Sequence, residues 1–419
     1  MGVKVTVVGG GSTYTPELVE GVVNRADRLP IDELSLLDVD GERLAIVGGL
    51  AGRMLDRAGW GGHLSLETDR AAALDGADFV LVQLRVGGQA ARLRDETVPP
   101  RYGAVGQETT GPGGLAKAIR TVPVILDLAE EVGRRAGAGH WIVDFTNPVG
   151  IVTQALVDGG HRALGLCNVA IGMQRWLADW LGVEPSRVTL EHVGLNHLSW
   201  VRAVYVDGAD VLPRLLADEP ERIAEHTGLG VDVVKRMGAI PSYYLRYYEA
   251  TDTVVREQLD GHTRAADVMD IERQLLDMYR DPALTEKPAL LGKRGGAYYS
   301  EAAVDLIASL HDGRGDVQVV DVRNAGALPD LGDSAVVEVP ARIDRDGAHP
   351  LPLAPLSAEQ RELVQAVKAY EMLAVEAART GEREAALRAL MANPLARDVA
   401  DPAGLLDDLL ADQAPVGGA

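Results

Sequence analysis

The stretch VKVTVVGGGSTYTP, residues 3–16, has the pattern of a strand that runs into a glycine turn and then into a helix. Alternating β-branched residues favour a strand that ends at Val8, and three glycines follow it directly. Pro16 suits the first turn of a helix, because its missing N–H costs no hydrogen bond there. In this setting, backbone N–H groups and a helix N-terminus can receive a pyrophosphate. We therefore predict a dinucleotide-binding unit.

The acidic end of the second expected strand strengthens this prediction. Asp38, with Asp40 close by, can accept hydrogen bonds from ribose hydroxyls and disfavours a 2′-phosphate, so NAD is expected rather than NADP. Tyr14 stands where the usual fingerprint has a small residue, which indicates different packing of the helix on the strand. The expected cofactor contacts are Gly9, Gly10, Gly11, Ser12, Thr13 and Asp38.

The first 170 residues alternate short apolar runs with helical patterns, which predicts repeated βα units and a parallel sheet. The expected strands are 4–8, 33–38, 63–67, 78–84, 140–146 and 162–167. Beyond them we expect a helix at 171–181, antiparallel strands within 188–206, helices within 213–310, strands within 317–340, a proline-rich connector at 340–355 and one or two helices within 358–390. The predicted fold class is α/β, with a Rossmann-like domain at 1–170 and an α+β domain at 171–419.

Composition narrows the class of partner and the compartment. The chain has 419 residues and a net charge of −21, which argues against nucleic acid, since phosphate backbones need a basic surface. It has one cysteine, so no intramolecular disulfide can form. Neither a signal peptide nor an apolar run of membrane-spanning length is recognisable. We expect a cytoplasmic protein that binds a small molecule and not a membrane.

Cys167 and His197 are candidate metal ligands, although their spacing is a weak signature. The ordinary alternatives are a small buried thiol and a hydrogen-bonded histidine. Cys167 ends an expected parallel strand, and Asn147 and Arg85 directly follow two others; ligands collect beyond the carboxyl ends of such strands. From ligand softness alone, the metal would be zinc.

Several ordered motifs resemble the family 4 glycoside hydrolases, in particular the members that act on 6-phospho-β-glucosides. They are VVGGGSTYTPELV, RLRDETVPPRYGAVGQETTGPGGLAKAIRTVPV, DFTNPVGIVTQAL, LCNVAIG, VGLNHLSW and IPSYYLRYY, and the resemblance as a whole extends from Val3 to about Ala303. The resemblance implies hydrolysis by redox chemistry: NAD⁺ takes a hydride from C3 of the sugar, a base removes the C2 proton, the C1 substituent leaves, water adds and the hydride returns. The two-carboxylate scheme of other glycosidases does not apply to this family.

The resemblance also implies a metal and a base. It assigns manganese to Cys167 and His197 together with sugar oxygens, which overrules zinc because oxygen ligands suit a harder ion. The base falls on Tyr244, with Glu108 in an assisting position. A phenol needs a nearby cation to act as a base at neutral pH. Without the motif, Tyr243, Tyr247 and Tyr248 compete with Tyr244, and the cluster could equally be aromatic packing.

The implied substrate is a 6-phospho-sugar. By resemblance its contacts are Arg92, Asn147, Asn168 and Arg264. Arg294 is a further candidate for an anion contact, and the plain alternative for Arg92 is an ion pair on its own helix with Asp95 or Glu96. The second domain would carry the substrate, the metal and the contacts of a homodimer or homotetramer.

Asn168 and Ala170 mark departures within the metal motif. Members that act on α-linked substrates have an aspartate after the cysteine, whereas this chain has Asn168, whose amide cannot donate a proton as an acid does. This position predicts β-linked substrates and leaves the acid for the leaving group unassigned. Ala170, where the β-type motif has proline, implies a local loop difference.

Two alternatives remain on the sequence alone. A 2-hydroxy-acid dehydrogenase like malate or lactate dehydrogenase shares the early βα pattern and an Asn-Pro turn, but it needs a catalytic histidine and aspartate and no metal. A nucleotide sensor or scaffold that has lost catalysis would have little use for Cys167, His197, Tyr244 and Arg92 together.

Overall fold

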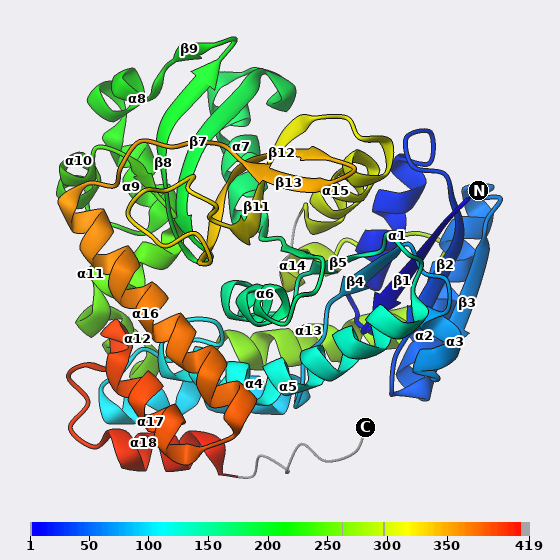
Figure 1. Cartoon of the computed structure of the whole chain (residues 1–419), viewed down its shortest axis with the longest axis horizontal. Helices are drawn as coiled ribbons and strands as arrows, with labels where there is room; N and C mark the ends of the chain where they lie inside the picture. The colour runs from blue at the N-terminus through cyan, green and yellow to red at the C-terminus, as the bar shows by residue number, and fades with distance from the viewer. Residues whose placement is uncertain (1, 262, 296–297, 412–419) are drawn as a thin grey trace.

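A nine-stranded sheet dominates the computed structural model, which describes residues 2–261, 263–295 and 298–411 (Figure 1). The strand order is β13-β12-β11-β6-β5-β4-β1-β2-β3. The strands are β1 Val3–Val8, β2 Ile31–Leu37, β3 His63–Glu67, β4 Phe79–Val82, β5 Trp141–Asp144, β6 Ala163–Gly165, β11 Asp316–Arg323, β12 Val336–Asp344 and β13 Gly347–Pro350. The strands β1 to β6 are parallel, so the predicted Rossmann-like sheet is confirmed.

Helices connect the parallel strands. They are α1 Thr15–Asn24, α2 Gly41–Arg57, α3 Arg70–Leu74, α4 Gly88–Thr97, α5 Gly111–Arg135 and α6 Val149–Asp158, and α7 Asn168–Leu181 leads from β6 to the second half of the chain. α1 has Pro16 in its first turn, as predicted, and α2 buries Leu44, Val47 and Leu50 on one face. α1 packs against α2, and α5 packs against α4 and α6, so each connection is anchored by its neighbour.

The second half of the chain is α+β, as predicted. Its small antiparallel sheet contains β7 Val188–Leu195, β8 Leu198–Val206, β9 Ala209–Asp210 and β10 Ile240–Pro241. In Figure 1 this sheet lies at the upper left, away from the blue N-terminal strands. The helices are α8 Leu212–Asp218, α9 Pro220–Thr227, α10 Val231–Met237, α11 Arg246–Glu249, α12 Thr251–Asp260, α13 Arg264–Tyr279, α14 Leu291–Arg294, α15 Tyr299–Asp312, α16 Ala358–Thr380, α17 Arg383–Ala392 and α18 Pro402–Leu410. No helix in the described ranges is long and apolar enough to cross a bilayer.

The prediction of a connector at 340–355 is wrong over much of this range. β12 continues to Asp344 and forms a hairpin with β13, in which Ala341 pairs with Pro350. The C=O of Pro340 still accepts a hydrogen bond from the N–H of Leu351 at 2.9 Å, because proline lacks only the donor. Proline density therefore marked the end of a strand pair and not a linker.

The large sheet crosses the boundary predicted at residue 170. Asp321 of β11 pairs with Gly165 of β6, so strands from the second half of the chain complete the sheet of the first half. A contiguous core of buried apolar residues includes Val3 and Leu409. The division into 1–170 and 171–419 stays a prediction, and these two regions share a sheet and a core.

A substitution at Gly165 tests how tightly β6 packs against the residues around it. A Cβ on Gly165 would lie 2.3 Å from Thr153 Oγ1 and 2.8 Å from Asp321 Cβ. We expect Gly165→Ala to lower the free energy of unfolding by about 1–3 kcal/mol through overpacking. Gly172→Ala is the control, because a Cβ there meets nothing within 4 Å and alanine stabilises a helix interior by roughly 0.5–1 kcal/mol. Equal stability of the two variants in urea denaturation would contradict this packing.

Candidate active site

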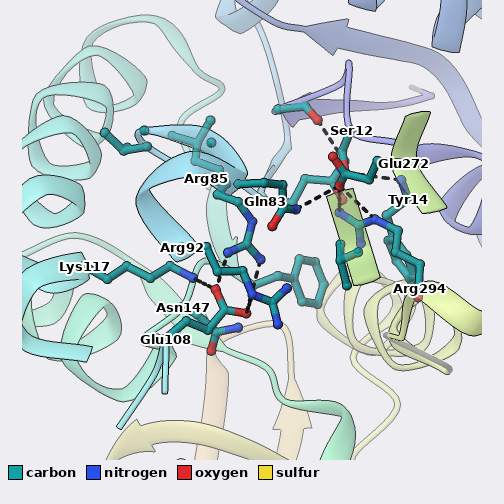
Figure 2. Close-up of a pocket in the computed structure, with 18 of the residues that line it drawn as sticks. Ser12, Tyr14, Gln83, Arg85, Arg92, Glu108, Lys117, Asn147, Glu272 and Arg294 are labelled. Atoms are coloured by element: carbon teal, nitrogen blue, oxygen red, sulfur yellow. Dashed lines mark hydrogen bonds and ion pairs between the residues drawn. The ribbon is translucent and has the colours of Figure 1, made fainter. Parts of the chain in front are cut away.

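A cavity of about 1860 Å³ lies along the carboxyl edge of the parallel sheet. Typical small-molecule sites have volumes of about 300–1,000 Å³, so this cavity has room for a dinucleotide and a second ligand. Of the residues predicted for the site, Gly9, Ser12, Asp38, Arg92, Glu108, Asn147, Asn168, His197, Tyr244 and Arg264 line it. Gly10, Gly11, Thr13 and Cys167 are buried behind its wall. Figure 2 shows Ser12 and Glu108 in the same pocket, on different elements.

The three glycines of the loop shape the backbone and do not offer free donors. The N–H groups of Gly9 and Gly10 both donate to Leu37 O, at 2.9 and 2.8 Å, and that of Gly11 donates to Asp38 Oδ2 at 2.8 Å. A Cβ on Gly10 would lie 2.8 Å from Leu36 Cβ. The glycines are therefore needed so that the loop can lie against β2, and a pyrophosphate would instead meet Ser12 and the start of α1.

Asp38 is held in place beside this loop. Its Oδ2 accepts the Gly11 N–H and its Oδ1 accepts the Asp40 N–H at 3.0 Å, while the side chain still lines the cavity. Arg43, which sequence reasoning missed, also lines the cavity and donates to Gly11 O at 2.7 Å. Glu272 pairs with Arg43 at 3.2 Å and offsets its charge.

Glu108 is the centre of a buried group of charges (Figure 2). Its carboxylate pairs with Arg85, with Lys117 at 2.5 Å and with Arg92 at 3.3 Å. Burial raises the pKa of this carboxyl, but the three cations together hold it well below its usual range. Burial also lowers the pKa of Lys117 to about 7. Lys117 was missed because nothing in its local sequence indicates that it faces Glu108.

The ion pair that was the plain alternative for Arg92 is present, together with a position at the cavity wall. Its Nε donates to Glu96 Oε1 at 2.7 Å, one turn along α4, while the same side chain lines the cavity and meets Glu108. Asp95 pairs with Arg120 instead. Arg92 is thus positioned by two carboxylates at the cavity wall.

Two other arginines near the cavity are engaged within the protein. Arg294 pairs with Glu272 at 3.0 Å, and Arg264 donates to Lys293 O at 2.7 Å. Glu272 accepts hydrogen bonds from Arg43, Gln89 and Arg294, and sequence reasoning did not identify it. Figure 2 shows Glu272 and Arg294 beside Tyr14 and Ser12, at the side of the pocket opposite Lys117 and Glu108.

His197 has the geometry of a ligand. It lies in the turn between β7 and β8 with φ of 60°, a backbone conformation that is uncommon for residues other than glycine. Its Nδ1 is buried without a hydrogen-bond partner. Burial lowers the pKa of the imidazole to about 4, so the ring is neutral at pH 7 and can offer a lone pair to a metal.

Cys167 lies two residues after β6 and precedes α7. Burial raises the pKa of its thiol well above the usual value, and the charge of Glu338 raises it further. In the ranges that the structure describes, no three His, Cys, Asp or Glu side chains gather in a metal-binding group. A cation held by Cys167 and His197 would therefore take its remaining ligands from a bound molecule.

A buried polar group supports the turn that carries His197. His192 Nε2 lies 2.7 Å from Glu338 Oε2, and Asn196 donates to Glu338 Oε1 at 3.3 Å. Glu338 is 142 positions from Asn196 in the sequence, so no local motif could have linked the two. The geometry indicates that Glu338 fixes the β7–β8 turn.

Three of the four tyrosines of the motif line the cavity, and the fourth packs against the core. The Tyr244 ring stacks on His197, with centroids 3.9 Å apart, and lines the cavity. Burial raises the pKa of its phenol well above the usual range. Tyr243 and Tyr247 also line the cavity, whereas Tyr248 packs against the core. Aromatic packing thus accounts for Tyr248, and Tyr244 stands beside the candidate metal ligand.

The chain matches the models of the family 4 glycosyl hydrolases, at residues 4–183, and of the family 4 glycosyl hydrolase C-terminal domain, at residues 192–396. This chain belongs to the family 4 glycosyl hydrolases. A family member from Bacillus subtilis, named a probable 6-phospho-beta-glucosidase, is 41% identical over 98% of this chain and 96% of its own. The Escherichia coli 6-phospho-beta-glucosidase is 36% identical, over 94% of this chain and 91% of its own.

A solved structure from the same family has the same fold. The 6-phospho-beta glucosidase from Thermotoga maritima, with NAD and glucose-6-phosphate, is 33% identical with a TM-score of 0.92, and 98% of each chain is covered. Another form of that enzyme contains manganese as well, with a TM-score of 0.91, 33% identity and 97% of each chain covered.

This chain shares only its fold with the hydroxy-acid dehydrogenases that were the alternative. Malate dehydrogenase from Cryptosporidium parvum is 14% identical with a TM-score of 0.56, over 91% of this chain and all of its own. The shared feature is the Rossmann-like sheet, which hosts many chemistries.

The charge group around Glu108 predicts a large loss of stability. Glu108→Gln would leave Arg85, Arg92 and Lys117 buried without their common counter-charge, and we expect the free energy of unfolding to fall by about 3–5 kcal/mol. The matched control is Asp207→Asn, which breaks an exposed pair with Arg187 and should leave the melting temperature nearly unchanged. Equal melting temperatures for Glu108→Gln and the parent protein would contradict the assigned role of Glu108.

Proposed function

We propose that this protein is a 6-phospho-β-glucosidase that uses NAD⁺ and Mn²⁺. The observation that carries the proposal is the continuity of the cavity, which joins the glycine loop and Asp38 to His197 and Tyr244. Sequence relatives with 6-phospho-beta-glucosidase in their names, at 41% and 36% identity, support it.

The residues around the glycine loop fit a dinucleotide. The loop lies against β2 with no room for a Cβ on Gly10 or Gly11, and the cavity opens beside Ser12 and Asp38. We propose that Gly9, Gly10, Gly11, Ser12, Thr13 and Asp38 form this part of the site, with Asp38 accepting from ribose hydroxyls. NAD⁺, when bound, accepts a hydride from C3 of the sugar and returns it later, so that no cofactor is consumed.

The donors at the other end of the cavity fit a divalent cation. His197 offers a buried, unpartnered Nδ1, and Cys167 offers a sulfur that becomes a good ligand on losing its proton. The cation, when bound, stabilises negative charge that develops on the sugar oxygens. Cys167 and His197 are the proposed ligands from the protein.

Tyr244 is the proposed base. Its ring stacks on His197, a proposed metal ligand, and it lines the cavity. Tyr244 takes the C2 proton, the C1 substituent leaves with its bonding electrons, and water adds at C1 before the proton returns to C2. We propose that Glu108 assists by holding Arg85, Arg92 and Lys117 in place around the sugar.

The phosphate of the substrate requires cationic and polar partners. Arg92 and Asn147 both line the cavity, and the buried, unpartnered Oδ1 of Asn147 can accept a hydrogen bond from a sugar hydroxyl. We propose Arg92, Asn147, Asn168 and Arg264 as the substrate contacts, with arginine suited to phosphate. Arg294 serves Glu272 and is left out of this set.

Asn168 supports the preference for the β-anomer. It lines the cavity directly after Cys167, where an aspartate could protonate the leaving group of an α-linked substrate. An amide cannot supply that proton, so a substrate whose leaving group departs from the other face is favoured.

We also propose a compartment and an assembly for this protein. The single cysteine fits a reducing compartment, and we propose the cytoplasm. A homodimer or homotetramer is proposed from the family resemblance, and light scattering of the purified protein would determine it.

The activity is tested with 4-nitrophenyl 6-phospho-β-glucoside. We expect hydrolysis that stops when NAD⁺ is omitted or when divalent cations are chelated, and that returns when NAD⁺ and Mn²⁺ are added. His197→Asn should require more Mn²⁺, whereas the exposed His349→Asn should not. Net formation of NADH with a 2-hydroxy acid, or hydrolysis that ignores both additives, would contradict the proposal.

The base is tested by exchange of the C2 proton of glucose 6-phosphate in D₂O. Tyr244→Phe removes the hydroxyl that would accept the proton, and we expect exchange to fall by about 100-fold or more while NAD⁺ binding is unchanged. Tyr247→Phe is the control, because its ring also lines the cavity, 6.0 Å from Tyr244, and should retain exchange. Undiminished exchange in Tyr244→Phe would remove Tyr244 as the base.

A further inference from the structure

Tyr243 is exposed where other aromatic residues are covered. Its side chain is 43% exposed, while every other Phe, Trp or Tyr ring in the described ranges is half-buried or buried. It lines the large cavity, so part of its exposed surface borders the space in which the substrate would bind. Tyr243 therefore offers apolar surface to a bound molecule.

Tyr243 is the last member of a stack of three rings. The Tyr244 ring lies 3.9 Å from His197 at 21° and 4.2 Å from Tyr243 at 33°. Two rings cannot both lie about 4 Å from the same face of a third ring, so His197 and Tyr243 flank Tyr244. The order in space is therefore candidate metal ligand, candidate base and exposed ring.

The leaving group is attached to C1, which is bonded to C2, the carbon at which Tyr244 is proposed to act. A leaving group at C1 is therefore within reach of the side chains around Tyr244. Among these, Tyr243 offers an exposed ring in the cavity.

We propose that Tyr243 is the platform on which the leaving group of the substrate stacks, and that it favours planar, aromatic leaving groups over small aliphatic ones. The inference rests on the proposed function and adds a specificity-determining residue to it. Stacked aromatic pairs contribute enough for about a two- to tenfold effect on a kinetic constant. The ring, and not the hydroxyl, carries the effect.

The test compares 4-nitrophenyl and methyl 6-phospho-β-glucosides in Tyr243→Leu, Tyr243→Phe and Tyr243→Trp. Each variant is compared with the parent enzyme on the same substrate, so the intrinsic reactivity of the leaving group cancels. We expect Tyr243→Leu to lower kcat/KM about two- to tenfold for the nitrophenyl substrate, mainly through KM, with no such loss for the methyl substrate. Tyr243→Phe and Tyr243→Trp keep a ring and should retain the preference.

Proton exchange at C2 of glucose 6-phosphate separates this inference from the proposed function, because that compound has no leaving group beyond a hydroxyl. Normal exchange in Tyr243→Leu shows an intact site, and Tyr247→Leu is the matched control for loss of a cavity tyrosine. Equal losses on both glucosides, no loss on either, or loss of the preference in the two variants that keep a ring would overturn the platform. Absence of exchange in the parent enzyme would overturn the proposed function itself.

Discussion

The shared direction of β1, β4, β5 and β6 is the constraint on which the site depends. These strands are neighbours in a parallel sheet, so the residues that follow them emerge at the same edge. Gly9, Arg85, Asn147 and Cys167 come from four separate parts of the chain, yet each follows one of these strands. The small antiparallel sheet then brings His197 to this edge on the β7–β8 turn. A glycine loop and a candidate metal ligand can therefore face the same cavity.

Charged side chains form much of the cavity wall, and they are held by each other. Glu108 binds Arg85, Arg92 and Lys117, and Glu272 binds Arg43 and Arg294. Removing such groups from water is costly, and their mutual attraction offsets that cost only while every partner is present. The ion pairs hold each guanidinium in position before a ligand arrives. The side chains therefore lose little conformational freedom when an anion binds.

Local sequence patterns were sufficient to predict many helices and strands, but not the roles of several residues. The strand and helix around the glycine loop follow from alternation, glycine and proline, and the structure contains them at Val3–Val8 and Thr15–Asn24. The bonds from the glycine N–H groups to Leu37 and Asp38 were not indicated by the local pattern. The connector predicted at 340–355 was wrong, since proline spacing does not reveal that β12 finds partners in β11 and β13.

Predictions that rest on one short motif could be made from the residues themselves, such as a dinucleotide loop at Gly9 to Gly11 with an acid at Asp38, whereas the meaning of the amide at Asn168 came from the family resemblance. Pairings between distant residues could not be predicted in this way, because they depend on how the sheets pack and not on neighbours in the chain. Glu338 beneath the His197 turn, Glu272 between two arginines, and the stack of His197, Tyr244 and Tyr243 are of this kind. The burial of each side chain also depends on the tertiary structure. The folded environment lowers the pKa of the His197 imidazole and leaves the Tyr243 ring exposed.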